Sequence, residues 1–127
     1  MTNRAVISTP NAPEAIGPYS QAVKVGSTVW LSGQIPLVPG TMELITGDIQ
    51  AQARQVFRNL AAVAEAAGGG LDNAVKINIS LTDMGDFADV NEVMAEFLCA
   101  PYPARACVQV AALPKGVAIE VEAILAV

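Results

Sequence analysis

The sequence predicts an α+β fold in which one sheet carries two amphipathic helices on a single face. Segments with strand-like alternation and segments with helix-like stripes follow one another in the order β-β-β-α-β-α-β-β. Each helical segment repeats apolar residues at spacings of three and four, so each helix has one face to bury. Two such helices cover only one face of a sheet, and we expect the other face to be open in a single chain.

The composition predicts a single domain over residues 1–127 that associates with copies of itself. The chain is 53% hydrophobic and only 15% charged, so some apolar surface is expected to be buried between subunits. No apolar run approaches the ~18 residues of a membrane span, and the N-terminus lacks an apolar core of signal-peptide length. We therefore expect a cytoplasmic protein without membrane contact.

Charge and residue usage exclude several functional classes. The net charge is −5 and the basic residues are scattered, which argues against nucleic-acid binding as the function. The two cysteines are too few for a disulfide framework. The absence of histidine removes His-based triads and His metal ligands, so no metal site is predicted.

The N-terminal third predicts three strands. Residues 4–8 fit a short edge strand, and residues 9–18 contain three prolines and fit an irregular crossing segment. Residues 22–25 and 28–32 alternate around Gly26-Ser27, which predicts a hairpin.

The middle third predicts a helix, a strand and a second helix. Asp48 is a plausible N-cap for the first helix, which Gly68-Gly69-Gly70 would end. A strand over residues 75–81 follows, and Asp83 is expected to cap the second helix. The expected buried stripes are Ile49, Ala53, Val56, Leu60, Val63 and Ala67 in the first helix, and Phe87, Val90, Met94 and Phe97 in the second.

The C-terminal segment 101–127 predicts a hairpin with a turn at Leu113-Pro114-Lys115-Gly116. A turn centred on Pro114-Lys115 would place Gln109 opposite Glu120 and Cys107 opposite Glu122, on one face. The open face would then be semi-polar, with Lys76, Asn78, Ser80, Arg105, Cys107, Gln109, Glu120 and Glu122.

This polar face has two interpretations. It is either a solvated surface with a weak ion pair, worth ~0–1 kcal/mol, or a site that combines a fixed cation with a carboxylate. In the second interpretation the cation would hold an anion, and the carboxylate would handle a proton or a water. The residue pattern alone leaves both open.

Several spaced motifs give the chain a resemblance to the RidA family, also called YjgF. They are GPYSQAV (17–23), SGQIP (32–36), PARACVQV (103–110), LPKG (113–116) and IEVEAI (119–124), and with the helix pair they cover nearly the whole chain. The resemblance implies a chorismate-mutase-like fold with a mixed sheet. It also implies a homotrimer, with three sheets in a central barrel, helices outside and active sites between subunits.

The resemblance further implies hydrolysis of reactive enamines and imines to 2-keto acids and ammonia. The implied substrates are 2-aminoacrylate, 2-iminopropanoate and 2-iminobutanoate, which escape from pyridoxal-phosphate-dependent dehydratases. The implied role is metabolite damage control, coupled to such dehydratases, with no cofactor.

In this resemblance Arg105 would hold the substrate carboxylate with its planar fork of donors, and Glu120 would position the attacking water. Cys107 would contribute mainly backbone groups, with a nucleophilic thiol as a weaker alternative. The other implied substrate-binding residues are Tyr19, Ser32, Gly33, Phe87, Asn91 and Pro114.

Two departures from the family's commonest pattern stand out. The connection over residues 98–102 is shorter than in many members, which leaves the preferred substrate size open. Ala106 stands where serine or threonine is frequent, but it should point away from Arg105. Two other functions remain alternatives: a module that binds 2-keto acids without turnover, and an RNA-directed activity, as described for some relatives.

Overall fold

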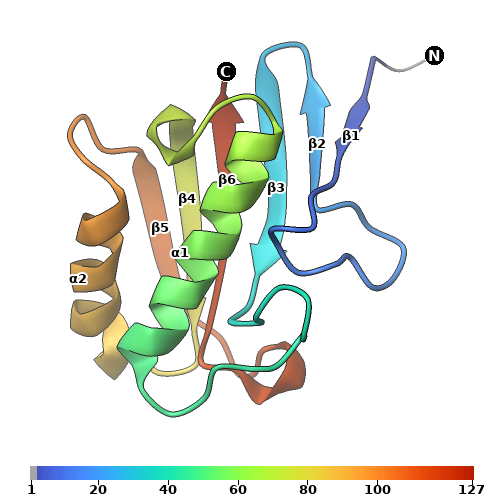
Figure 1. The fold of residues 1–127 in the computed structure, drawn as a ribbon. Helices are drawn as coiled ribbons and strands as arrows, with labels where there is room; N and C mark the ends of the chain where they lie inside the picture. Colours follow the sequence, from blue (N-terminus) through green and yellow to red (C-terminus); the bar gives the residue numbers. More distant parts are fainter. Residues whose placement is uncertain (1–2) are drawn as a thin grey trace.

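A computed structural model describes residues 3–127 as one six-stranded mixed sheet with two α-helices on the same face (Figure 1). The strand order is β1-β2-β3-β6-β4-β5. The elements are β1 (Ala5–Ile7), β2 (Ala22–Val25), β3 (Thr28–Gln34), α1 (Ile49–Ala66), β4 (Ala74–Leu81), α2 (Phe87–Phe97), β5 (Ala104–Gln109) and β6 (Ile119–Ala126).

The local predictions hold for most elements. The β2–β3 hairpin forms as expected, and the Asp48 side chain caps α1 by accepting a hydrogen bond from the Gln50 N–H at 3.1 Å. Asp83 differs, because its side chain accepts from the Gly85 N–H and caps a single 3₁₀ turn, Met84–Asp86. The helix α2 proper begins only at Phe87.

The hydrophobic core lies between the two helices and the covered face of the sheet. Phe57, which lies outside the predicted stripe of α1, is fully buried and stacks on Phe97 with ring centroids 5.5 Å apart. Two amides of α1 that lie outside the predicted apolar stripe are also buried, Gln52 and Asn59. The main buried side chains of the core are Val29, Val56, Phe57, Leu60, Val63, Ile77, Ile79, Leu81, Val90, Val93, Ile119, Val121 and Leu125.

The buried amides of α1 hold loops at one end of the sheet. Asn59 donates from Nδ2 to the carbonyl of Leu37 at 2.9 Å. Gln52 accepts through Oε1 from the Ala118 N–H at 3.3 Å. Both amides therefore satisfy loop backbone groups that β-pairing leaves without a partner.

The predicted C-terminal hairpin is wrong, because β4 lies between β5 and β6. Strand β5 runs parallel to β4 and pairs Arg105 with Ile77 and Cys107 with Ile79, while β6 runs antiparallel to β4 and pairs Glu120 with Ser80. The physical reason is the crossover: β4, α2 and β5 form a β-α-β unit, whose strands are parallel.

This topology corrects the predicted open face. Paired residues share a face, so Arg105, Cys107 and Gln109 lie on the side of the helices with the isoleucines and leucine of β4. The polar residues of β4 and β6 do face the open side, as expected: Lys76, Asn78, Ser80, Glu120 and Glu122.

Exposed apolar side chains flank this polar strip. On one side the register aligns Val6, Val23 and Trp30 across β1, β2 and β3, and Val6 and Trp30 are 65% and 46% exposed. On the other side Val108 of β5 is 53% exposed. The single chain therefore leaves apolar surface on its open face uncovered. Among residues 3–127, no helix has the length and apolar character needed to cross a membrane.

Candidate active site

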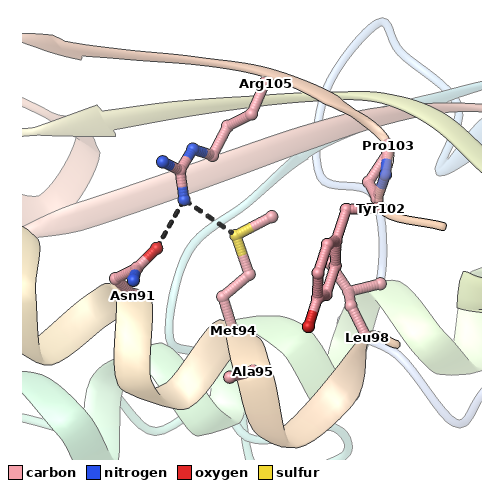
Figure 2. Close-up of a pocket in the computed structure, with 7 residues that line it drawn as sticks. All are labelled: Asn91, Met94, Ala95, Leu98, Tyr102, Pro103 and Arg105. Atoms are coloured by element: carbon pink, nitrogen blue, oxygen red, sulfur yellow. Dashed lines mark hydrogen bonds between the residues drawn. The ribbon is translucent and has the colours of Figure 1, made fainter. Parts of the chain in front are cut away.

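Arg105 extends from β5 over the face of α2 that carries Phe87, Asn91 and Met94. Its guanidinium carbon lies 5.0 Å from the centre of the Phe87 ring, a cation–π contact. Its Nη1 donates to Oδ1 of Asn91 and contacts Sδ of Met94 at 3.7 Å (Figure 2). A cavity of about 450 Å³ adjoins these groups, and its lining comprises Asn91, Met94, Ala95, Leu98, Tyr102, Pro103 and Arg105.

No carboxylate of the described chain pairs with Arg105. Within residues 3–127, the one ion pair joins Arg54 of α1 to Glu96 of α2, with 2.9 Å between Nη2 and Oε2. The interpretation of Arg105 as half of a surface ion pair is therefore wrong. Its permanent charge is available to an anion from outside the chain.

Glu120 lies on the open side of the sheet, at a second cavity of about 620 Å³. Five residues predicted for the site line this cavity: Tyr19, Ser32, Gly33, Pro114 and Glu120. Segments far apart in the sequence thus meet at one end of β3 and β6, where the register between the two strands shifts.

Gly33 makes room for the Glu120 side chain. A Cβ placed on Gly33 would lie 2.9 Å from Cδ of Glu120, closer than real side chains pack. The half-buried carboxyl group has its pKa raised, mainly by burial and further by the negative charge of Glu122. A carboxylate whose pKa is shifted toward neutrality is suited to accept and return a proton.

Tyr19 and Ser32 form one wall of the Glu120 cavity. The Tyr19 side chain is 53% exposed, and its hydroxyl accepts from the Ile16 N–H at 3.3 Å. The Ser32 hydroxyl donates to the carbonyl of Ser20, so that donor is already used within the chain. These bonds attach the irregular segment before β2 to the end of β3.

Gln21, which was not among the predicted site residues, organises the same segment. Its amide is 4% exposed, donates to the carbonyls of Thr9 and Pro13 at 3.0 and 2.8 Å, and accepts from the Thr9 N–H at 2.7 Å. A buried amide with several backbone partners fixes an irregular chain segment. The signal in the sequence is its place directly after Tyr19 and Ser20, next to a proline-rich stretch.

Cys107 lies beside Arg105 on the helix side of β5, with Sγ 3.9 Å from Sδ of Met84. Burial raises the pKa of this thiol, and the nearby charge of Arg105 only partly opposes the shift. A thiol with a raised pKa is a poor thiolate nucleophile at neutral pH. The geometry thus favours Cys107 as a wall and backbone element over a nucleophile.

The predicted site residues fall into two half-sites. The arginine half-site comprises Arg105, Phe87, Asn91 and Cys107, and the carboxylate half-site comprises Glu120, Tyr19, Ser32, Gly33 and Pro114. The sheet separates the side chain of Arg105 from that of Glu120. One chain alone does not bring the cation and the carboxylate together, contrary to the face predicted from the sequence.

The fold and the two half-sites define a small α+β protein that presents a cation to an anion and, separately, a carboxylate with a raised pKa. The family described as Endoribonuclease L-PSP matches residues 9–127. The chain belongs to this family, which is the RidA/YjgF family. The mixed sheet with two helices on one face is the chorismate-mutase-like fold of RidA structures.

Curated relatives and solved structures match along almost the full chain. The 2-iminobutanoate/2-iminopropanoate deaminase of Dermatophagoides farinae is 49% identical and covers 100% of this chain and 99% of its own. The human protein of the same name is 47% identical, with 95% of this chain and 88% of its own covered.

Among solved structures, RidA from the Antarctic bacterium Psychrobacter sp. is 58% identical with a TM-score of 0.94, covering 97% of this chain and 99% of that one. E. coli TdcF with bound serine is 46% identical with a TM-score of 0.91, covering 97% of this chain and 98% of that one. Family membership supports imine deamination as the general activity.

Proposed function

We propose that this protein hydrolyses 2-imino acids to 2-keto acids and ammonia, at sites formed where two copies of the chain meet. One copy supplies the arginine half-site and the adjacent copy supplies the carboxylate half-site. The observation that carries this proposal is the position of Arg105 and Glu120 on opposite sides of one sheet. The two groups can act on one substrate only if they come from different copies.

The surface of the single chain supports self-association. The open sheet face carries exposed Val6, Trp30 and Val108 beside a polar strip, and copies of the chain would cover them. A closed ring of three copies, with the open faces inward, gives every copy the same pair of contacts. We therefore propose a homotrimer with three equivalent sites.

The substrate class follows from Arg105 and from the relatives. A guanidinium without a carboxylate partner suits a planar carboxylate, which every 2-imino acid carries next to its C=N carbon. Two relatives are named for iminobutanoate and iminopropanoate, and TdcF was solved with serine, an α-amino acid with the same carboxylate. Small imino acids such as 2-iminopropanoate and 2-iminobutanoate are thus the proposed substrates.

In the proposed mechanism, Arg105 first binds the carboxylate through paired hydrogen bonds and fixes the position of the imine carbon. Glu120 of the adjacent copy then accepts a proton from a water molecule as its oxygen attacks this carbon. The C–O bond forms, the C=N π electrons move to nitrogen, and Glu120 passes the proton taken from water to nitrogen, which gives a carbinolamine and regenerates the carboxylate.

Collapse of the carbinolamine completes the reaction. The hydroxyl loses its proton to Glu120, which passes it to nitrogen; the C–N bond then breaks, the C=O bond forms, and nitrogen leaves as ammonia. The raised pKa of the Glu120 carboxyl suits a group that must accept and return protons within one turnover. An enamine such as 2-aminoacrylate first gains a proton at its terminal carbon and loses one from nitrogen, which converts it to the corresponding imine.

The proposed substrate class indicates which type of reaction produces the substrate. Enamines of this kind are released when a pyridoxal-phosphate-dependent dehydratase removes water from serine or threonine. These imines are electrophiles that other cellular nucleophiles can attack before water does. The proposed role is therefore to clear the products of such a dehydratase.

A subunit-mixing experiment tests the shared site. Arg105→Ala and Glu120→Gln chains are each assayed alone, then denatured together and refolded as a mixture. Random assembly should restore about one quarter of wild-type activity, since a site needs the intact Arg105 of one chain and the intact Glu120 of another. Keto-acid release from an enzymatically generated imine, above the spontaneous rate, is the readout.

The same assay separates the alternatives. Two inactive variants that stay inactive when mixed would contradict a site shared between copies. A wild-type protein that binds pyruvate but releases no keto acid above background would be a binding module. Salt-dependent RNA cleavage that survives in Arg105→Ala would favour the endoribonuclease activity named for the family.

A further inference from the structure

Among residues 3–127, the guanidinium of Arg105 makes its polar contacts through only one of its three nitrogens. Nη1 donates to the Asn91 amide oxygen and lies 3.7 Å from Sδ of Met94, while the ring of Phe87 lies 5.0 Å from Cζ. No bond from Nε or Nη2 to another group of residues 3–127 accompanies them. Figure 2 shows Nη1 facing α2 and the other two nitrogens pointing away from Asn91 and Met94.

The edge of the Arg105 guanidinium formed by Nε and Nη2 is the one that suits a carboxylate. Nε–H and one N–H of Nη2 are parallel and match the two oxygens of a carboxylate. An arginine side chain is long and flexible, so this edge is useful only if the head group is held in one orientation. The contacts at Nη1 provide that restraint without using the free edge.

The cavity beside Arg105 makes the restraint necessary. Its volume of about 450 Å³ is far larger than a guanidinium group, and Met94 lies between Arg105 and the part formed by Leu98, Tyr102 and Pro103 (Figure 2). The exposed ring of Tyr102 also offers an alternative surface for a cation. A released Arg105 side chain could therefore turn into this cavity, away from a substrate.

We propose that Met94, together with Asn91, is a positioning residue for Arg105. The two acceptors hold Nη1 over α2, keep the guanidinium out of the cavity, and leave the Nε–Nη2 edge for the substrate carboxylate. The inference rests on the proposed function for the identity of that anion. The restraint itself concerns only groups within one chain.

The chemistry of Met94 suits this role. Its side chain is 6% exposed, so the thioether has a defined position between the core and Arg105. A thioether is a weak neutral acceptor, which orients the cation without neutralising it. An acidic residue there would instead form an ion pair with Arg105 and compete with the substrate.

Two variants at position 94 test the proposal. Met94→Leu keeps the apolar volume but removes the acceptor, and Met94→Gln restores an acceptor on an unbranched side chain. We expect the Leu variant to raise KM and the Kd for pyruvate by about two- to tenfold, the effect of one lost hydrogen bond, with kcat nearly unchanged. The Gln variant should recover most of the loss.

A spectroscopic readout makes the test independent of activity. In ¹⁵N NMR spectra of the wild type, the two Nη groups of Arg105 should give separate signals, because the contacts at Nη1 hinder rotation. These signals should merge in Met94→Leu and stay apart in Met94→Gln. Val93→Ile, a conservative change at the fully buried neighbour of Met94 on α2, is the matched control and should leave both KM and the signals unchanged.

The possible outcomes distinguish the two proposals. Separate Nη signals and wild-type KM in Met94→Leu would overturn the positioning role, whatever the activity of the wild type. A wild-type protein without turnover, whose Nη signals still depend on Met94, would instead overturn the proposed reaction and confirm the restraint on Arg105.

Discussion

The two half-sites of this protein are built on opposite principles. In the arginine half-site, an exposed cation is held by side chains of a helix: the ring of Phe87, the amide of Asn91 and the thioether of Met94. In the carboxylate half-site, a half-buried acid lies against the bare backbone of Gly33, and the surroundings raise its pKa. One half restrains a group that is always charged, and the other adjusts how readily a group becomes charged.

The contrast indicates that the two half-sites have different roles. Arg105 gains nothing from burial, because its charge is permanent and its task is orientation. Glu120 benefits from burial, because the cost of ionisation moves its pKa toward the range useful for proton transfer. Mutations should therefore act on orientation in the first half-site and on proton transfer in the second.

The largest expected effect is at Arg105. Arg105→Ala should abolish detectable deamination, and Arg105→Lys should still be slower by at least ~10²-fold, because a single ammonium cannot orient a carboxylate as the fork does. Both variants should also lose pyruvate affinity, measured by calorimetry. They should remain folded, because the Arg105 side chain is exposed although it lies on the helix side of the sheet.

Arg58→Ala is the matched control, because Arg58 is an exposed arginine on α1 far along the chain from either half-site. It should leave turnover and pyruvate affinity unchanged. Near-normal turnover in folded Arg105→Ala would contradict the arginine half-site altogether.

Glu120→Gln should have the next largest effect, a loss of about 10²–10⁴-fold in kcat, because the proton acceptor disappears while the shape remains. Pyruvate affinity should change little, which would separate the roles of the two half-sites. Equal losses of pyruvate affinity in Glu120→Gln and Arg105→Ala would remove the distinction drawn between them.

We also expect Glu120→Gln to raise the stability of the protein in a pH-dependent way. The pKa of Glu120 is raised in the folded state, so the protonated carboxyl favours folding more than the ionised one does. Its favourable contribution to the free energy of unfolding is fully present below the ordinary carboxyl pKa and is lost as pH rises through the folded-state pKa. Glu120→Gln should therefore have a higher Tm than the wild type near neutral pH. The difference should shrink as pH falls through the folded pKa into the ordinary carboxyl range, as measured by thermal denaturation across pH.

The smallest expected effect is at Gly33. A Cβ there would meet Cδ of Glu120 at 2.9 Å, so Gly33→Ala must move the carboxylate by a few tenths of an ångström. We expect about a tenfold loss of kcat, since misplacement by about an ångström can cost 10²-fold. Gly70→Ala is the control, because nothing lies within 4 Å of a Cβ at that position. Unchanged kcat in Gly33→Ala would mean that Glu120 need not be held against this backbone.

Local patterns in the sequence determined most of the elements. Alternation predicted β2 and β3, the apolar stripes predicted both helices, and Asp48 was identified as the cap of α1. These predictions succeed because each rests on interactions between residues close in sequence. The motifs likewise placed the chain in its family, because they preserve residue types at fixed spacings.

Only the tertiary structure decided which face each site residue occupies. Alternation shows that Arg105 and Cys107 share a face, but it does not show which partner strand fixes that face. The turn-like LPKG segment suggested pairing of β5 with β6, whereas the β-α-β crossover through α2 places β4 between them. That one change of neighbour moves Arg105 to the helix side, beside Asn91 and Met94, and separates it from Glu120.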